Sequence, residues 1–535
     1  MGGTRSRVVR HYVPVAVAAA AVALLVVLAP TVAPPAAAPA ASSGAGAGAR
    51  PAYPPGDAPG DPGVAASGVR CGNGARQVTW SRYAPYCQPA FHGHNGGATS
   101  PGVTGSTITV TFRYAATPIE QKLFAQVAPG TFETEAQSIA LARQYVSLFN
   151  RDFDLYGRRV VLKVFNGKGD FLAELSGTGK VAAQADASTA KSLGAFADVS
   201  GTVFNTAPYD DALSAQHVVS VGGLLASATA MRAHAPYQYF PGPDCEKTAT
   251  STAAVVARAM AGLPAIYAGS AALRHRTRTF ALISPDNAAY ATCGQAVVTD
   301  LADRYGIHLK AWIKYHLSLN ALQTAAAQAA NTVTQLQADG VTTVLCGCDP
   351  ITPLFLAQDA ATQHYEPEWL ALGYGDAFSR LPSAVSPAEW DHSIAGGYAS
   401  LPPAQQEAVA AYRLATHDPT ATPPPSYQYV YEPLLLLFDG LQAAGPDLTP
   451  ATFAAGIASL PPSLPGGEFG PWSFGPGTVD PSAGFQLLRW DSTATSPQDG
   501  KPGTGLPCNG GTVYRFADVA ATLPDHRQLQ CPAVP

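Results

Sequence analysis

The chain has 535 residues, of which 47% are hydrophobic and only 13% are charged, with a formal net charge of −5. This length suggests two to four modules or lobes, and the apolar fraction is sufficient for buried cores. The chain has no basic excess, which argues against nucleic acid as a partner, because phosphate binding relies on clustered Lys and Arg. With 20 Phe, 22 Tyr and 6 Trp, disorder of the whole chain is excluded.

The N-terminal residues indicate export. Arg5, Arg7 and Arg10 precede an apolar run at residues 13–29, which is the pattern of a secretory signal. The run is also nearly long enough to span a bilayer, so residues 1–33 fit either a cleaved signal peptide or an uncleaved signal anchor. In both cases the remainder lies outside. We therefore expect an extracytoplasmic protein, secreted or tethered to the outer face of the cell membrane.

Residues 34–70 are rich in Pro, Ala, Gly and Ser, a composition that buries too little apolar surface to fold. This segment is predicted to be a flexible, partly extended tether.

An even number of cysteines agrees with an exported, disulfide-bonded protein. The eight are Cys71, Cys87, Cys245, Cys293, Cys346, Cys348, Cys508 and Cys531. Local pairing is expected for Cys71 with Cys87, in an N-terminal segment at 71–100. It is also expected for Cys508 with Cys531, in a C-terminal tail at 493–535.

No metal site or cofactor is expected. Cys346-Gly347-Cys348 lacks the spacing of a zinc site and has no histidine beside it. His92 and His94 lie in a Gly-rich loop, which disfavours a metal site there.

From residue 106 onward, strand and helix patterns alternate, which predicts an α/β fold with parallel sheets and helices on both faces. The expected strands are 106–114, 159–165, 195–200, 218–222, 279–284, 308–315, 341–346 and 369–373. The expected helices are 134–149, 180–193, 249–261, 290–305, 321–338 and 351–363. Such sheets bind ligands outside the carboxyl ends of their strands.

Several short motifs, taken in their order along the chain, resemble the type I periplasmic solute-binding proteins of ABC importers, in their branched-chain amino-acid-binding branch. They lie at residues 101–104 (PGVT), 156–160 (YGRRV), 237–240 (YQYF), 284–290 (SPDNAAY), 360–369, 427–440 and 466–490. The resemblance covers about residues 100–492. It implies two Rossmann-like lobes joined by a three-crossover hinge, which close on a small solute.

The resemblance also implies the lobe boundaries. The first lobe is expected at 101–240, completed by about 395–460. The second is expected at 241–394, completed by about 461–492.

The implied function is capture of a small polar solute, an amino acid or related compound, by a monomer that delivers it to an ABC transporter permease. The alternative is an envelope-anchored sensory domain of the same fold. An enzyme is not expected, because no Gly-x-Ser-x-Gly or His-Glu-x-x-His motif is present. Residues 177–180 (GTGK) do not complete a phosphate-binding loop either, because Glu174 and Val181 replace two of its required residues.

The solute is expected between loops at the strand ends. The candidate residues are Ser200, Thr202, Gly222 and Gly223 in the first lobe, and Tyr290, Asp349 and Asp376 in the second. Hydroxyls and backbone N–H groups of the first lobe suit a carboxylate. In the second lobe an aromatic ring suits the apolar part and an acid suits an ammonium.

Each candidate also has a structural alternative. Ser200 and Thr202 fit helix caps, Tyr290 a core residue and Asp376 a turn. Asp349 precedes Pro350, which favours a helix cap. Two residues depart from the amino-acid-binding pattern: Leu224 stands where a hydroxyl is expected, and Cys348 where an aromatic is expected.

The four central cysteines are expected at the carboxyl edge of the second lobe, because its first and third strands are neighbours. A Cys346–Cys348 bridge would close a very small ring and strain the dihedral angles. Cys245 and Cys293 are therefore expected each to bridge one of Cys346 and Cys348.

Overall fold

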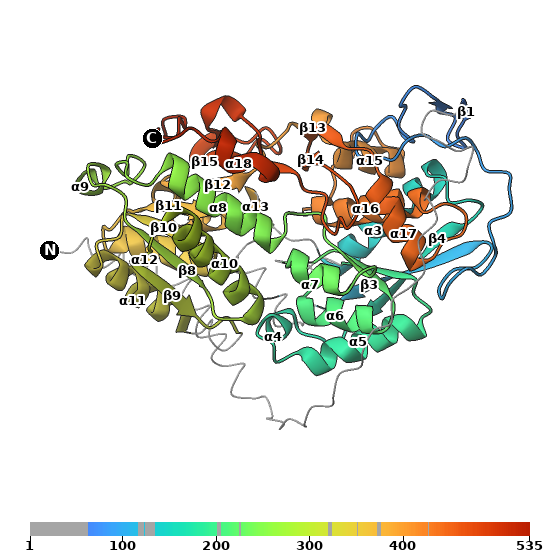
Figure 1. Cartoon of the computed structure of the whole chain (residues 1–535), viewed down its shortest axis with the longest axis horizontal. Helices are drawn as coiled ribbons and strands as arrows, with labels where there is room; N and C mark the ends of the chain where they lie inside the picture. The colour runs from blue at the N-terminus through green and yellow to red at the C-terminus, as the bar shows by residue number, and fades with distance from the viewer. Residues whose placement is uncertain are drawn as a thin grey trace, which may run out of the picture.

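A computed structural model describes residues 62–115, 122, 134–200, 205–223, 226–318, 324–349, 351–371, 376–425 and 427–534. Two α/β lobes lie side by side, the first on the right and the second on the left of Figure 1. The predicted signal segment and most of the predicted tether fall outside these residues. Within them, no helix combines the length and apolarity needed to cross a membrane.

The first lobe is built on a parallel five-stranded sheet in the order β4-β3-β5-β6-β7. Its strands are β3 (Thr107–Tyr114), β4 (Arg159–Asn166), β5 (Ala197–Ser200), β6 (Val219–Val221) and β7 (Gln238–Tyr239). Alternation along β3 sends Ile108, Val110 and Phe112 into the main core of the lobe. Thr111 and Arg113 point to the opposite face, where they meet Asp198 and the ring of Tyr209.

Helices cover both faces of this sheet. The core on one face contains α3 (Glu135–Asp152), α15 (Glu407–Thr416), α16 (Tyr427–Ala443) and α17 (Pro450–Ser459). The core on the other contains α5 (Lys180–Ser192) and α6 (Ala207–Ala215). The lobe also contains α4 (Phe171–Leu175) and α7 (Ala228–Ala233). Thr134 and Gln137 form a capping box that fixes the start of α3.

The second sheet has the order β16-β15-β12-β11-β10-β8-β9, with β17 paired to β15. Its strands are β8 (Phe280–Pro285), β9 (Ala311–Tyr315), β10 (Thr343–Cys346), β11 (Glu368–Ala371), β12 (Ser393–Gly397), β15 (Gly484–Thr495), β16 (Pro502–Pro507) and β17 (Tyr514–Arg515). Strands β8 to β12 run parallel, and the last three are antiparallel additions at one edge.

Helices α8 (Cys245–Ala259), α10 (Ala288–Tyr305) and α18 (Val519–Thr522) contribute to the core on one face of the second sheet. Helices α11 (Ala325–Ala338), α12 (Thr352–Thr362) and α14 (Pro387–Trp390) contribute to the core on the other. Two more helices, α9 (Ala271–Arg274) and α13 (Asp376–Val385), complete the lobe.

The chain passes between the lobes three times, as the resemblance implied. It leaves the first sheet after β7, returns after β12 to form α15, α16 and α17, and re-enters the second sheet at β15. A short hairpin of β13 (Ser463–Gly467) and β14 (Gly470–Trp472) precedes the last passage. The return to the first lobe begins after Gly397, close to the predicted residue 395.

Both ends of the described chain contain strands that the sequence did not predict. Strand β1 (Gly63–Val64) pairs with β2 (Arg70–Cys71), so regular structure begins inside the predicted tether. Strands β16 and β17 pair with β15, so part of the predicted C-terminal tail at 493–535 belongs to the second sheet. The predicted Cys71–Cys87 and Cys508–Cys531 disulfides are confirmed.

The predicted pairing of the central cysteines is wrong: Cys245 pairs with Cys293, and Cys346 pairs with Cys348. The physical reason is the face of the second sheet on which each pair lies. Cys346 ends β10 and Cys348 lies in the loop after it, and both belong to the core on the α11 and α12 face. Cys245 and Cys293 belong to α8 and α10, which pack against each other over the opposite face. The sheet therefore separates the two pairs.

Candidate functional site

The first-lobe candidates lie where β5 and β6 end. Ser200 is the last residue of β5, and Thr202 lies outside the described residues. Gly222 and Gly223 follow β6 with φ of 146° and 130°, values that favour glycine. A Cβ on Gly223 would stand 3.3 Å from Asp210 Oδ2, so this loop passes directly over a carboxyl group.

Two buried acids, Asp198 and Asp210, lie beneath these strand ends. Burial raises the pKa of Asp198 to about 7, although Thr111 Oγ1 at 2.6 Å and Tyr209 Oη at 3.1 Å donate to its carboxylate. Burial likewise raises the pKa of Asp210 to about 8, and the Ser220 hydroxyl donates to it. Both carboxyls therefore exchange protons near neutral pH, beside the loops expected to hold the solute.

Arg113, at the end of β3, holds the neighbouring loop and α4 in place. Its guanidinium donates to both oxygens of Glu174, at 2.8 and 3.0 Å, and to Asp186 at 3.1 Å. It also lies 3.5 Å from the ring centroid of Tyr209. Asp186 in turn accepts from the backbone N–H groups of Lys168 and Gly169. This network was not predicted, although a charged residue in a strand without other charges was a signal for it.

The second-lobe candidates occupy the start of α10, the loop after β10 and the start of α13. Tyr290 is buried, with 2% of its surface exposed, as its core alternative anticipated. Asp376 begins α13, and its side chain is outside the described residues. A ligand role for either residue stays a prediction.

Asp349 bonds to the backbone at the start of α12. Its Oδ1 accepts from the N–H groups of Ile351 at 2.7 Å and Thr352 at 3.1 Å. Tyr315, at the end of β9, donates its hydroxyl to Asp349 Oδ2 at 2.5 Å. Asp349 therefore holds the start of α12, in line with its structural alternative, and a ligand role for it stays a prediction. Its partner Tyr315 was not predicted.

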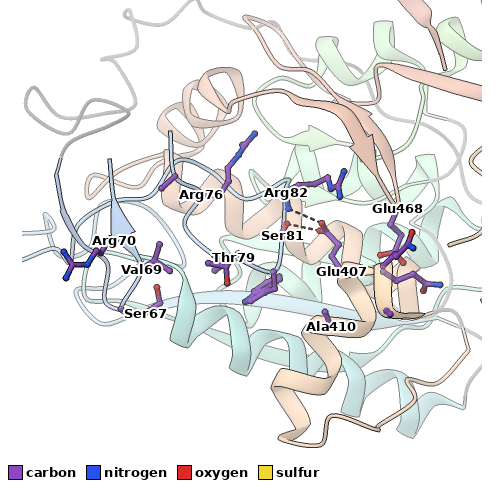
Figure 2. A pocket seen from close by; sticks show the side chains of 17 residues that line it. Ser67, Val69, Arg70, Arg76, Thr79, Ser81, Arg82, Glu407, Ala410 and Glu468 are labelled. Carbon is purple, nitrogen blue, oxygen red and sulfur yellow. Dashed lines mark hydrogen bonds between the residues drawn. The ribbon is translucent and has the colours of Figure 1, made fainter. Parts of the chain in front are cut away.

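A separate groove of about 1000 Å³ lies between the N-terminal segment and α15. Figure 2 shows Ser81 and Arg82 on one side of it, both hydrogen-bonded to Glu407. None of the residues predicted to bind solute lines this groove. In the described part of the chain, no group of three or more His, Cys, Asp or Glu side chains is arranged to hold a metal ion.

The comparisons with known proteins agree with this architecture. A model of the periplasmic binding protein family matches residues 129–495, well over half of the chain. No curated protein matches it.

Solved structures resemble the fold at low sequence identity. The leucine-, isoleucine-, valine-, threonine- and alanine-binding protein from Brucella ovis, in its closed conformation, superposes with a TM-score of 0.52 and 14% identity, covering 80% of this chain and 99% of that one. A fatty acid ABC transporter substrate-binding protein from Thermomonospora curvata superposes with a TM-score of 0.52 and 13% identity, covering 80% of this chain and 97% of that one. An ABC transporter substrate-binding protein from Aeropyrum pernix superposes with a TM-score of 0.51 and 13% identity, covering 80% of this chain and 97% of that one.

These structures establish the type I fold, and the family model extends across both lobes. The chain belongs to the periplasmic binding protein family, whose members are extracytoplasmic binding proteins rather than enzymes.

Proposed function

We propose that this protein captures a small polar solute between its two lobes and delivers it to an ABC importer. One observation carries the proposal: segments that follow strands of both sheets touch each other. Asn287 follows β8 in the second lobe and donates to the carbonyl oxygen of Leu175, in α4 after β4 of the first lobe, at 3.1 Å. The carboxyl edges of the two sheets therefore face one another, where such sheets bind ligands.

The buried acids support a particular kind of solute. With a pKa of about 8, Asp210 is mostly protonated at pH 7 and tolerates an anionic group beside the Gly222–Gly223 loop. An amino acid or related compound, with its carboxylate toward the first lobe, fits this environment. Cys348 is part of a disulfide, so the aromatic contact expected at that position is absent and the apolar part must be held differently.

The test is a binding screen by native mass spectrometry and thermal shift. The panel holds amino acids, small acids, amides and sugars, with fatty acids added because one similar structure is a fatty acid transporter component. A true solute should raise the melting temperature and compact the protein in small-angle scattering, because hinge closure shortens the molecule. Conversion of any panel member into product would contradict a pure binding role.

An envelope-anchored sensory receptor is the second candidate, favoured by the length of the apolar run at residues 13–29. The mature N-terminus separates the two functions. A chain that begins between about residues 33 and 50 supports a released importer component. A chain that begins near Met1 and needs detergent for extraction supports the receptor. We propose a monomer in either case.

A further inference from the structure

Asn287 makes an unusual use of its side chain. It occupies the N-cap position of α10, where an Asn oxygen ordinarily accepts from a backbone N–H of the first turn. Here no such cap bond forms. The side-chain amide instead donates to the carbonyl oxygens of Leu175, at 3.1 Å, and Leu317, at 3.0 Å. Its oxygen accepts from the Leu317 N–H at 3.2 Å. Asn287 therefore lacks the usual cap bond to α10 and makes a contact between the lobes instead.

The second-lobe side of this contact is fixed in advance. Leu317 lies just past β9 and is 2% exposed, and it holds the Asn287 amide through both its carbonyl and its N–H. The loops after β8 and β9 are joined again by Asp286, whose N–H donates to the Tyr315 carbonyl at 2.8 Å. The Asn287 amide is therefore oriented before the first lobe meets it.

The first-lobe side is also held by hydrogen bonds within its own lobe. Leu175 is the last residue of α4, and carbonyls at a helix end lack partners within the helix. Asp170 caps the start of this short helix through the Ala173 N–H at 2.7 Å. Glu174, next to Leu175, is fixed by both of its bonds to Arg113. The Arg113 network thus presents the Leu175 carbonyl at a defined place.

We propose that Asn287 is an interlobe latch: its donation to the Leu175 carbonyl stabilises the closed arrangement and so sets how tightly the solute is retained. Opening the hinge separates α4 from α10 and breaks this bond, while the two bonds to Leu317 lie within one lobe and persist. Because both partners are already ordered, forming the bond costs little additional conformational entropy. A solute that binds the closed arrangement gains apparent affinity in proportion to the population of that arrangement.

The test measures the distance between lobes by electron–electron double resonance in the full mature chain. Spin labels attached through non-natural amino acids replace Val181, which is 69% exposed in α5, and Thr299, which is exposed in α10. This avoids the native cysteines. The latch is part of the proposed closing motion, but the measurement uses no added solute. The distance measurement can therefore test the latch even if the binding screen finds no solute.

Two variants remove the latch differently. Asn287→Ala loses all three bonds, whereas Asn287→Asp keeps the acceptor for the Leu317 N–H and loses only the donor. Both should reduce the population at short distance several-fold. Thr292→Ala is the control on the same helix, because its exposed hydroxyl donates only to the Ala288 carbonyl. It should leave the distance distribution unchanged.

A change on the other lobe gives an independent check. Asp170→Ala removes the bond from the Ala173 N–H that caps α4 in the first lobe, and it should shift the distribution in the same direction. Combined with Asn287→Ala it should add nothing further, because both changes act on one contact. A wild-type distribution in Asn287→Asp, or fully additive shifts in the double variant, would overturn the latch.

Discussion

Glu389 and His392 lie 3.8 Å apart, from Oε2 to Nδ1, in the interior of the second lobe, yet they form a pair of neutral groups. Burial raises the pKa of Glu389 to about 8, despite a hydrogen bond from Trp369 Nε1 at 2.8 Å. Burial, together with the nearby charges of Arg489 and Arg274, lowers the pKa of His392 to about 4. At neutral pH the carboxyl keeps its proton and the imidazole has none, so no ion pair forms.

This pair predicts how stability depends on pH. A carboxyl whose pKa is raised on folding stabilises the protein below its unfolded pKa and loses that contribution as pH rises through about 8. A histidine whose pKa is lowered acts oppositely, but only below about 6.5. Between pH 6.5 and 8 the carboxyl is the only member of this pair that titrates, and Glu389 should contribute about 1–2 kcal/mol to the fall in stability. Asp198 and Asp210, whose pKa values are also raised, to about 7 and about 8, contribute to the same fall. Glu389→Gln keeps the acceptor for Trp369 and should therefore make this part of the profile of melting temperature against pH less steep, without flattening it.

Arg113 is predicted to be essential for the first lobe. Its side chain and those of Glu174 and Asp186 are all at most 3% exposed, so Arg113→Met leaves two buried carboxylates without their cation. The loss should be about 3–5 kcal/mol in chemical denaturation. Arg151→Met is the matched control, because the Arg151 side chain is 51% exposed and its pairing with Asp152 should contribute less than about 1 kcal/mol. Equal losses in the two variants would contradict the role given to Arg113.

Asp210 is predicted to make solute affinity depend on pH. As pH rises from 7 to 9 the carboxyl beneath Gly223 loses its proton, because its pKa is about 8. A solute whose carboxylate faces that loop then meets a second negative charge and should bind more weakly. Titration calorimetry with the solute found by screening measures the effect, and Asp210→Asn should abolish it. Affinity that rises with pH would mean that the solute brings a cation to the first lobe.

Replacing Tyr290 tests whether this residue lines the solute-binding cleft or only packs in the core. Its ring is buried in the second lobe, so Tyr290→Ala should lower stability by about 3–5 kcal/mol through the cavity it leaves. If the ring also covers the solute, the free energy of solute binding should become less favourable by about 1–3 kcal/mol, as expected for a lost apolar contact. Denaturation and calorimetry on the same variant separate the two effects.

Peptide mapping without reduction checks the disulfides. Digestion should release Cys245 joined to Cys293, and a separate peptide in which Cys346 and Cys348 are joined to each other. The Cys346–Cys348 peptide should show a mass two hydrogens below that of its reduced form. A peptide containing both Cys245 and Cys346 would instead restore the arrangement expected from sequence.

Local periodicity explains what the sequence predicted well. The strand at 159–165 and the helix at 180–193 agree with β4 and α5 within a residue, because their patterns arise within a few neighbouring positions. Contacts between residues far apart in the sequence could not be predicted in this way. The Arg113–Glu174 pair joins residues 61 apart, and no local pattern relates them. The error in the cysteine pairing had a structural cause, because Cys346 and Cys348 lie in the core on one face of the second sheet, whereas the helices that carry Cys245 and Cys293 lie on the other.

The candidate site was predictable only in outline. Strand ends located Gly222, Gly223 and Asp349, but whether Asp349 caps a helix or meets a solute depends on where Tyr315 and Thr352 lie. Asn287 was hidden for the same reason, because its sequence context is that of an ordinary helix start and its partner belongs to the other lobe.

The return of the chain to the first lobe has a consequence for how the molecule acquires its structure. Tyr145 of α3 donates to the carbonyl of Ala408, 263 residues later, and the core over β3 is closed by α16. An incomplete chain that stops after β7 therefore exposes the apolar face of its first sheet. Folding that depends on such distant contacts is slow, because a long loop must close before they form. A nascent chain should thus leave this face uncovered until α15, α16 and α17 have been synthesised.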